Sequence, residues 1–199
     1  MYNFENKSKN FNLARFERNC HMRNATRAVC STRQSIISAF AELVQEKEYA
    51  AISITDIVKR ANVSRMAYYR SFPLKEEIVV EYLDELLTEI LERIKGESQI
   101  DRIVVYRLTF GTIAAHRKFF QNIAASGLTD LISRSIIRHS YDMVTDYYHW
   151  KKEDRFKAYS FYYHVGGLIV AACAWLENGM SESVDEMAQL VCGISADFS

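Results

Sequence analysis

Two short helical patterns follow each other with only three residues between them, and this break constrains the fold more than any other feature. The first pattern ends at Asn62 and the second begins at Arg65. Asn tolerates the left-handed conformation that a helix C-terminus needs, and Ser64 offers a hydroxyl that can cap the next helix. Val63, the apolar residue of the turn, should pack between the two helices. Two helices joined by so short a turn form a helix-turn-helix unit.

The rest of the chain is also predicted to be helical. A single proline and seven glycines in 199 residues, nearly half of them apolar, favour long helices over a turn-rich β fold. Ser31 and Gln34 have the spacing of a capping box at the start of the first helix. We expect an all-α protein of about nine helices, over residues 31–46, 53–61, 65–71, 74–95, 100–116, 118–125, 128–150, 154–177 and 183–194.

Charge is distributed unevenly along this neutral chain. Residues 1–75 hold 13 Lys+Arg against 6 Asp+Glu, whereas residues 76–199 hold 12 against 19. A basic head on an acidic body fits a chain whose head meets a polyanion, although an ordinary solvated surface would look the same. We expect a flexible tail over residues 1–24, with Met22 as an alternative natural start. A helix-turn-helix DNA-binding domain (25–75) and a helical regulatory and dimerisation domain (76–199) follow.

The chain lacks the sequence patterns of enzymes and metalloproteins. Its four cysteines share no metal-ligand spacing, and we find no Ser-His-Asp arrangement, phosphate loop or metal motif. We therefore expect no catalytic residue, cofactor or metal. The N-terminus has no export signal and no apolar run approaches ~18 residues. These features predict a cytoplasmic protein that does not span a membrane. Its thiols are then expected to be reduced, a redox-sensing cysteine pair being the alternative.

The second helix of the unit carries side chains that suit DNA. Arg65 and Arg70 can read guanine edges or hold phosphates, and Tyr69 can hydrogen-bond a phosphate. Tyr68 falls on the same side as Phe72 and is expected in the core. The alternative is that the two arginines are ordinary solvated charges, since short helix pairs also occur in proteins that never touch DNA.

Other residues of the unit extend this predicted contact surface. Met66 and Ala67 can touch a thymine methyl group. Ser53 and Thr55 lie where the free N–H groups of a helix start favour a phosphate. Lys75 can hold a phosphate from the start of the next helix.

The segment from Thr32 to Glu77 resembles the DNA-binding domain of TetR-family transcriptional regulators. "TRQSIISAFAELVQEKEY" is similar to their first helix. "ISITDIVKRANVSRMAYYRSFPLKEEI" is similar to the next two helices and the start of the fourth, including the aromatic-x-x-Phe ending. The resemblance implies a homodimer in which each head reads half of a near-palindromic double-stranded DNA operator. The positions that match family DNA contacts are Ser53, Thr55, Arg65, Met66, Ala67, Tyr69, Arg70, Ser71 and Lys75.

The chain departs from the family pattern at three positions. Glu48 and Asn62 stand where the family often has glycine, and Ser71 stands where it often has histidine. Because serine is shorter than histidine, the contact that this position is expected to make with the DNA backbone is weakened or lost.

The C-terminal segment "FYYHVGGLIVAACAWLENGMSESVDEMAQLV" resembles that of some family members, notably a branch common in low-GC Gram-positive bacteria. The resemblance implies that the last two helices pair with a partner's to form a four-helix bundle. The first of them is apolar over most of its circumference, so it must be buried on more than one side, a core helix of a monomer being the alternative. The expected interface residues are Gly166, Gly167, Val170, Ala174, Met187, Leu190 and Val191.

The family resemblance also implies an effector pocket in the acidic body. Aromatic-lined cavities suit flat or apolar ligands, although aromatic residues at helical spacing are also typical of plain core. A small-molecule effector would change the spacing of the two heads through helix 74–95, a lever of about 30 Å. We expect a DNA-binding repressor, with a helical co-regulator or an activator working through protein contacts as the alternative. The candidate pocket residues are Tyr106, Phe110, Phe120, Tyr141, Tyr148 and Tyr163.

Overall fold

Helices account for every regular element in the part of the chain that the structure describes. This computed structural model describes residues 24–95, 101–147, 149–150 and 154–196, so the expected tail lies almost wholly outside it. The all-α prediction is confirmed. The elements are α2 (Asn24–Glu46), η1 (Tyr49–Ala51), α3 (Ile54–Arg60), α4 (Arg65–Ser71), α5 (Lys75–Lys95), α6 (Arg102–Ala115), α7 (Arg117–Ala125), α8 (Thr129–Tyr147), α9 (Arg155–Glu177) and α10 (Val184–Ala196).

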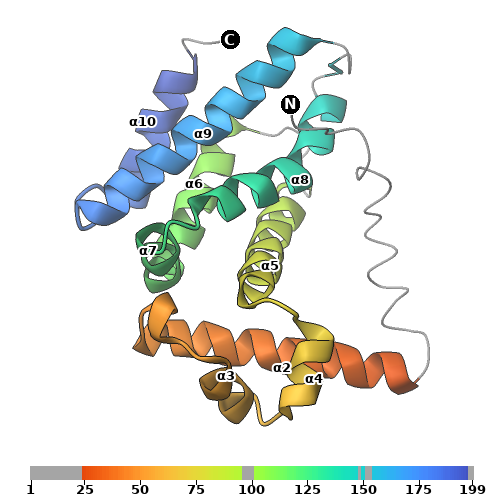
Figure 1. The fold of residues 1–199 in the computed structure, drawn as a ribbon. Helices are drawn as coiled ribbons and strands as arrows, with labels where there is room; N and C mark the ends of the chain where they lie inside the picture. Colours follow the sequence, from red (N-terminus) through yellow and green to blue (C-terminus); the bar gives the residue numbers. More distant parts are fainter. Residues whose placement is uncertain (1–23, 96–100, 148, 151–153, 197–199) are drawn as a thin grey trace.

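The first helices form a head at one end of the molecule. Helix α2 lies across α3 and α4, and α5 rises from them into the rest of the structure (Figure 1). Phe40, Tyr68 and Phe72 are fully buried where these helices meet. We call α2 to α4 the head and α5 to α10 the body.

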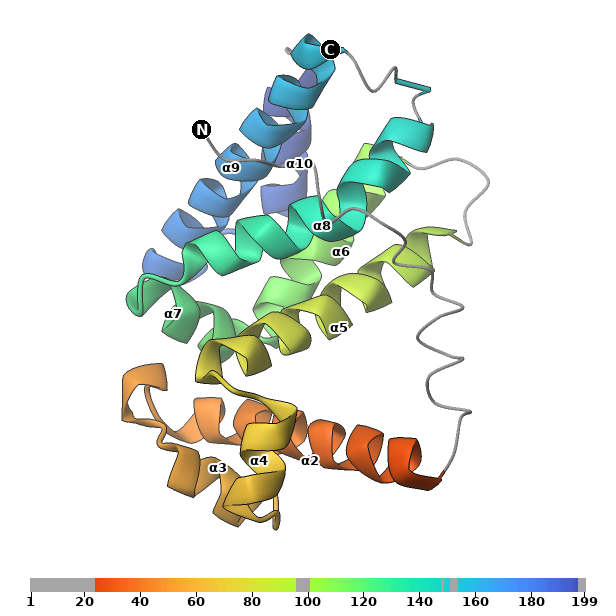
Figure 2. The same ribbon diagram turned by 45° about the vertical axis from the view of Figure 1, so that its right-hand side comes forward.

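The body surrounds an apolar interior. Helix α6 packs against α10, and α8 packs against both α5 and α9. Figure 2 shows α9 and α10 next to each other on the outer side of the body. Phe110 of α6 meets Trp175 of α9 edge-to-face, with 5.4 Å between ring centroids. The buried side chains of head and body form one continuous core.

The start of the first helix differs from the prediction. Helix α2 begins at Asn24, and the Ser31 carbonyl accepts a hydrogen bond from the Ser35 hydroxyl at 2.9 Å, one turn later in the helix. The expected capping box at Ser31 is therefore wrong. The preceding residues contain neither glycine nor proline, so nothing stops the helix from extending in the N-terminal direction.

Helix α9 could cross a membrane if length and composition alone were considered. Only 28% of its most apolar 18-residue window is buried inside the structure. A single such helix is weak evidence, because core helices of water-soluble proteins pass the same test.

Candidate nucleic-acid interface

The turn between α3 and α4 is closed by backbone hydrogen bonds. Asn62 adopts the predicted left-handed conformation, with φ of 52°. The Val63 N–H donates to the Val58 carbonyl at 3.1 Å, and the Asn62 N–H donates to the Lys59 carbonyl at 3.4 Å. This is the Schellman pattern of a helix C-terminus. Val58 and Val63 also pack against the core, as expected for Val63.

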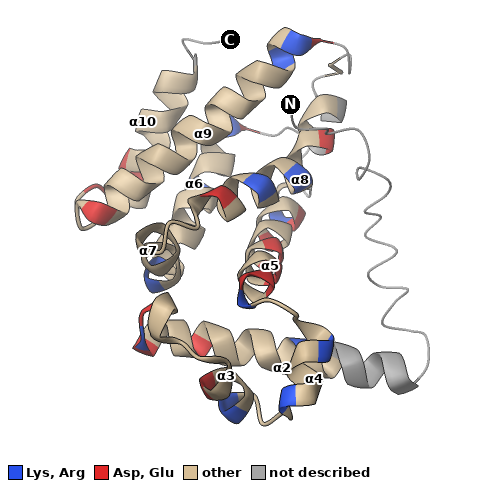
Figure 3. Cartoon of the chain, in the orientation of Figure 1, with Lys and Arg blue, Asp and Glu red and all other residues tan. Residues whose placement is uncertain are grey.

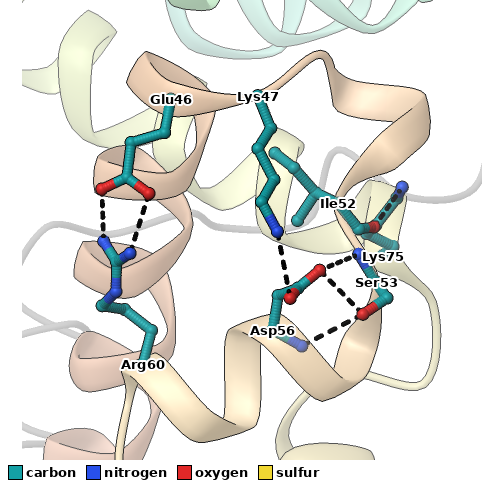
Figure 4. A network of polar contacts seen from close by, with 7 residues as sticks. All are labelled: Glu46, Lys47, Ile52, Ser53, Asp56, Arg60 and Lys75. Atoms are coloured by element: carbon teal, nitrogen blue, oxygen red, sulfur yellow. Dashed lines mark hydrogen bonds and ion pairs between the residues drawn. The ribbon is translucent and has the colours of Figure 1, made fainter.

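Serine hydroxyls begin both helices of the unit. Ser64 accepts a hydrogen bond from the Ala67 N–H at 3.1 Å, which confirms its predicted role as a cap. Ser53 accepts from the Asp56 N–H at 3.1 Å. The Asp56 carboxylate in turn accepts from the Ser53 N–H at 3.0 Å and from its hydroxyl at 2.8 Å (Figure 4). The Ser53 backbone and hydroxyl, followed by Lys47, lower the pKa of Asp56 to about 2.

Helix α4 separates an anchored face from an exposed one. Tyr68 and Phe72 are fully buried, as predicted, and burial raises the pKa of Tyr68 to about 12. Met66 and Tyr69 are 71% and 45% exposed on the outer side. Arg65 and Arg70 are exposed as well, and Ala67 is half-buried.

The outer surface of the head is basic on α4 and mixed on α3. Helix α4 contains no acidic residue, whereas α3 carries Asp56 beside Lys59 and Arg60 (Figure 3). Ser53 and Thr55 are exposed at the start of α3. The Ser53 hydroxyl and its backbone N–H are both engaged in the capping box with Asp56, so neither is free to bind a phosphate.

Ser71 and Lys75 lie apart from this exposed set. Ser71 is buried, and its carbonyl accepts a hydrogen bond from the Arg33 guanidinium. The Lys75 ammonium donates to the carbonyls of Tyr49 and Ile52 at 2.8 and 3.0 Å. It also lies 3.9 Å from the Tyr49 ring centroid, and burial lowers the pKa of Lys75. In this structure Lys75 therefore supports the η1 turn.

Arg33 positions α4, a role that the sequence did not predict. Its guanidinium bonds Glu81 of α5 at 2.7 Å and lies 4.2 Å from the ring centroid of Phe72. One side chain thus joins α2, the end of α4 and α5. A lone arginine on a predicted helix gave no local signal of this role, because its partners are far away in sequence.

Ion pairs fix α3 against the end of α2. Arg60 binds the Glu46 carboxylate with both terminal nitrogens, at 3.0 and 2.8 Å, and lowers the pKa of Glu46. Lys47 lies 3.1 Å from the Asp56 carboxylate. Figure 4 shows the two contacts side by side. Such partly exposed pairs orient α3 more than they stabilise it.

The last two helices expose an apolar face. Val170 and Leu190 are 69% and 54% exposed, and Gly166, Gly167 and Ala174 lie on the same exposed side of α9. Two residues of the expected interface lie elsewhere: Met187 and Val191 are buried in the core. Met187 and Val191 form the inward side of α10, whereas Leu190 and Ile194 form its outward side.

The aromatic side chains expected in an effector pocket are dispersed. Phe110 packs on Trp175, the Tyr106 hydroxyl lies 2.9 Å from the Ser195 hydroxyl, and Tyr141 stacks on Tyr162. Tyr163 is exposed, and Tyr148 lies outside the described residues. Of the five that the structure describes, only Phe120 lines the body cavity described next.

A cavity of about 60 Å³ lies between α5, α6, α8 and α9. Its walls are mainly aliphatic, and include Leu83, Leu86, Leu87, Ile136, Leu168 and Ile169. The sequence analysis did not predict this cavity, since an aliphatic residue has the same helical spacing in a packed core and beside a cavity. Among the described residues, no group of three or more His, Cys, Asp or Glu side chains is placed to hold a metal ion.

Two protein-family models match the chain. The one described as "Bacterial regulatory proteins, tetR family" matches residues 36–82, which contain α3, the turn and α4. The one described as "Transcriptional regulator C-terminal region" matches residues 103–197. Together they cover both the helix-turn-helix unit and most of the body.

Part of the chain is also similar to a curated transcriptional regulator. The chain is 32% identical over 69 residues to the uncharacterized HTH-type transcriptional regulator YxbF of Bacillus subtilis (strain 168). That match covers 34% of this chain and 18% of YxbF, so it spans less than a fifth of that relative.

Two solved structures share the fold. A tetR-family transcriptional regulator from Streptomyces coelicolor superposes with a TM-score of 0.64 and 18% identity, covering 83% of this chain and 81% of that one. The dihydroxyacetone kinase operon activator DhaS superposes with a TM-score of 0.58 and 18% identity, covering 83% and 94%.

Proposed function

Since the chain belongs to the TetR family of transcriptional regulators and has their helix-turn-helix domain, we propose that it is a homodimeric repressor of a near-palindromic operator. Residues 25–75 form the DNA-binding domain in this proposal, and residues 76–199 form the regulatory and dimerisation domain. A small-molecule effector releases the DNA. The family consists of regulators rather than enzymes, and we place the protein in the cytoplasm.

The outer face of α4 carries the proposal. Its exposed arginines and tyrosine stand on a helix fixed from behind by Tyr68 and Phe72. A recognition helix enters the major groove while the preceding helix crosses the backbone. Arg65 and Arg70 are then available for guanine edges, and Tyr69 for a phosphate.

The exposed face of α9 and α10 supports a dimer. Apolar side chains such as Val170 and Leu190 lose contact with water when a second copy covers them. The exposed glycines of α9 allow the partner helix to approach closely. Two heads can then reach half-sites about 34–36 Å apart on one duplex.

The route from body to head supports effector release. Leu83 and Leu86 of α5 line the body cavity, and the same helix begins at Lys75, just after α4. A ligand that binds one tilt of α5 better than another shifts the population of head spacings. Because the operator fixes that spacing, a small tilt weakens DNA binding.

Fluorescence anisotropy on labelled DNA from the region upstream of the chain's own coding sequence tests the proposal. We expect affinity for one fragment to fall steeply with salt, because phosphate contacts release counterions. Arg65→Ala should cost about 1–3 kcal/mol and relax preference at one base position. Arg93→Ala is the matched control, since Arg93 is exposed on α5 away from α4.

Two other outcomes have clear meanings. If no fragment binds in a salt-sensitive way, DNA reading is contradicted and the co-regulator alternative is favoured. The neighbour DhaS is described as an operon activator, so the sign of regulation needs its own readout. A reporter behind the bound fragment should rise when the gene is deleted, whereas a fall would identify an activator.

A further inference from the structure

The described walls of the body cavity carry no charged side chain and are mostly apolar. The lining contains no Asp, Glu, Lys, Arg or His among the described residues, and its polar side chains are two threonines and one cysteine. The Thr109 hydroxyl already donates to the Val105 carbonyl of its own helix at 2.8 Å. A ligand ion placed here would lose its hydration without a counter-charge, and such burial is strongly unfavourable.

The size of the cavity further restricts which ligands can bind. An apolar protein cavity of about 150 Å³ accommodates benzene, whereas this one measures about 60 Å³. An aromatic ring would have to displace the walls, but a narrow alkyl chain fits between leucine and isoleucine side chains. The flat aromatic ligand suggested by the tyrosine-rich sequence is therefore disfavoured.

We propose that this cavity binds the alkyl chain of an uncharged aliphatic molecule, and that this class of molecule is the effector. The effector role rests on the proposed function above, whereas the ligand class rests on the cavity alone. A hydroxyl loses far less free energy than an ion when it leaves water, so the ligand can carry one.

The cavity adjoins both connections between body and head. Leu83 and Leu86 belong to α5, which continues into the head. Phe120 belongs to α7, two residues before Asn122. The Asn122 side chain bonds the backbone of Tyr49 in the head. An alkyl chain inserted between α5 and α9 can therefore shift both α5 and the α7 contact with the head at once.

Cys173 provides a direct readout that needs no DNA. Cys173 is one of the residues that line the cavity, whereas Cys192 on α10 is not. The full chain is incubated with 1-butanol to 1-decanol, and alkylation of each cysteine by iodoacetamide is followed by peptide mass spectrometry. We expect the alcohols to slow alkylation of Cys173 and to leave Cys192 unchanged.

The alkyl chain length and the charge of the added ligand provide two further tests. Until the cavity is full, each added methylene should lower the half-protecting concentration about fourfold, the value for burial of one CH₂ group. Alkyl carboxylates and alkylammonium ions of matched length should protect at least tenfold more weakly. Equal protection by the ions, equal slowing of both cysteines, or no dependence on length would each overturn the proposal.

Cavity variants confirm the location. Ala172→Leu fills the cavity and should abolish protection, whereas Ala115→Leu on the exposed side of α6 is the matched control. If Ala172→Leu fails to fold, Leu87→Ala enlarges the cavity and should shift the preference to longer alcohols. An unchanged preference in Leu87→Ala would contradict the assigned site.

Operator binding is measured on the same samples. Protection of Cys173 without loss of DNA affinity supports the ligand class and contradicts only effector release. Absence of protection in a chain that still binds its operator contradicts the ligand class and leaves the proposed DNA reading intact.

Discussion

The side-chain carbonyl of Asn122 on α7 accepts a hydrogen bond from the backbone N–H of Tyr49 in the head, at 2.9 Å. The amide nitrogen of Asn122 donates to the carbonyls of Val44 and Lys47, at 3.0 and 3.3 Å. These carbonyls lie at the C-terminal end of α2, where helices lack internal partners. Lys118 adds a hydrogen bond to the Gln45 carbonyl at 2.7 Å. The body thus completes the hydrogen bonding of the head.

Asn122→Ala should destabilise the protein by about 1–3 kcal/mol, because the partly buried N–H of Tyr49 loses its acceptor. Urea unfolding followed by circular dichroism measures the change. Gln121→Ala, at the neighbouring position of α7, is the control and should cost much less. Equal losses in the two variants would show that the Asn122 contacts contribute nothing specific.

Asn62→Ala should destabilise by about 1 kcal/mol, because alanine pays a steric penalty in the left-handed conformation that this position requires. Asn62→Gly should stay within a few tenths of a kcal/mol of the natural chain, because glycine adopts that conformation freely. Chemical denaturation of both variants provides the comparison. A glycine variant less stable than the alanine variant would contradict the assigned role of the turn.

Asp56→Asn should remove a pH-dependent part of the stability. The pKa of Asp56 is lowered to about 2 by its hydrogen bonds to Ser53, below the value of about 3.9 in an unfolded chain. Its contribution is therefore complete above about pH 4 and is lost as the pH falls toward 2. The gap in thermal midpoint between the two proteins should shrink over that range. A gap that stays constant from pH 6 to about pH 2 would contradict this linkage.

Tyr69→Phe should weaken binding to all operator variants about equally, because it removes a hydroxyl placed for a phosphate. Anisotropy with a panel of single-base operator variants separates uniform weakening from altered preference. Tyr159→Phe, at an exposed tyrosine of α9, controls for general effects of losing a hydroxyl. A changed base preference in Tyr69→Phe would place this side chain against a base instead.

Val170→Asp should convert the proposed dimer to single chains, because a charge then lies in the middle of the apolar face of α9. Sedimentation velocity at micromolar concentration should show a fall from about twice to about once the 23.1 kDa chain mass. Ala125→Asp, at an exposed position of α7, should leave the mass unchanged. An unaltered dimer of Val170→Asp would move the interface to another surface.

The sequence was informative where the determinants are local. Ser64, Asn62 and the buried pair Tyr68 and Phe72 each act within a few residues of their partners, so their roles in the turn and in α4 could be predicted. The start of the first helix was mistaken because Ser31 has the spacing of a cap even inside a helix. Spacing alone could not show that the chain was already helical from Asn24.

Longer-range relationships could not be predicted from the pattern. Arg33 and Asn122 act on residues that lie far away in sequence, and neither stands in a recognisable motif. The cavity was also missed, since an aliphatic residue has the same spacing whether it fills a core or lines a void. Met187 and Leu190 lie in the same short helix, and only packing shows which one faces inward.

Native mass spectrometry of the protein with its operator duplex tests the central claim most directly, because it counts the chains on one piece of DNA. The account predicts two chains per duplex, and loss of that complex when either half of the operator is scrambled. Single chains at micromolar concentration, with the duplex either free or bound by one chain, would contradict the account.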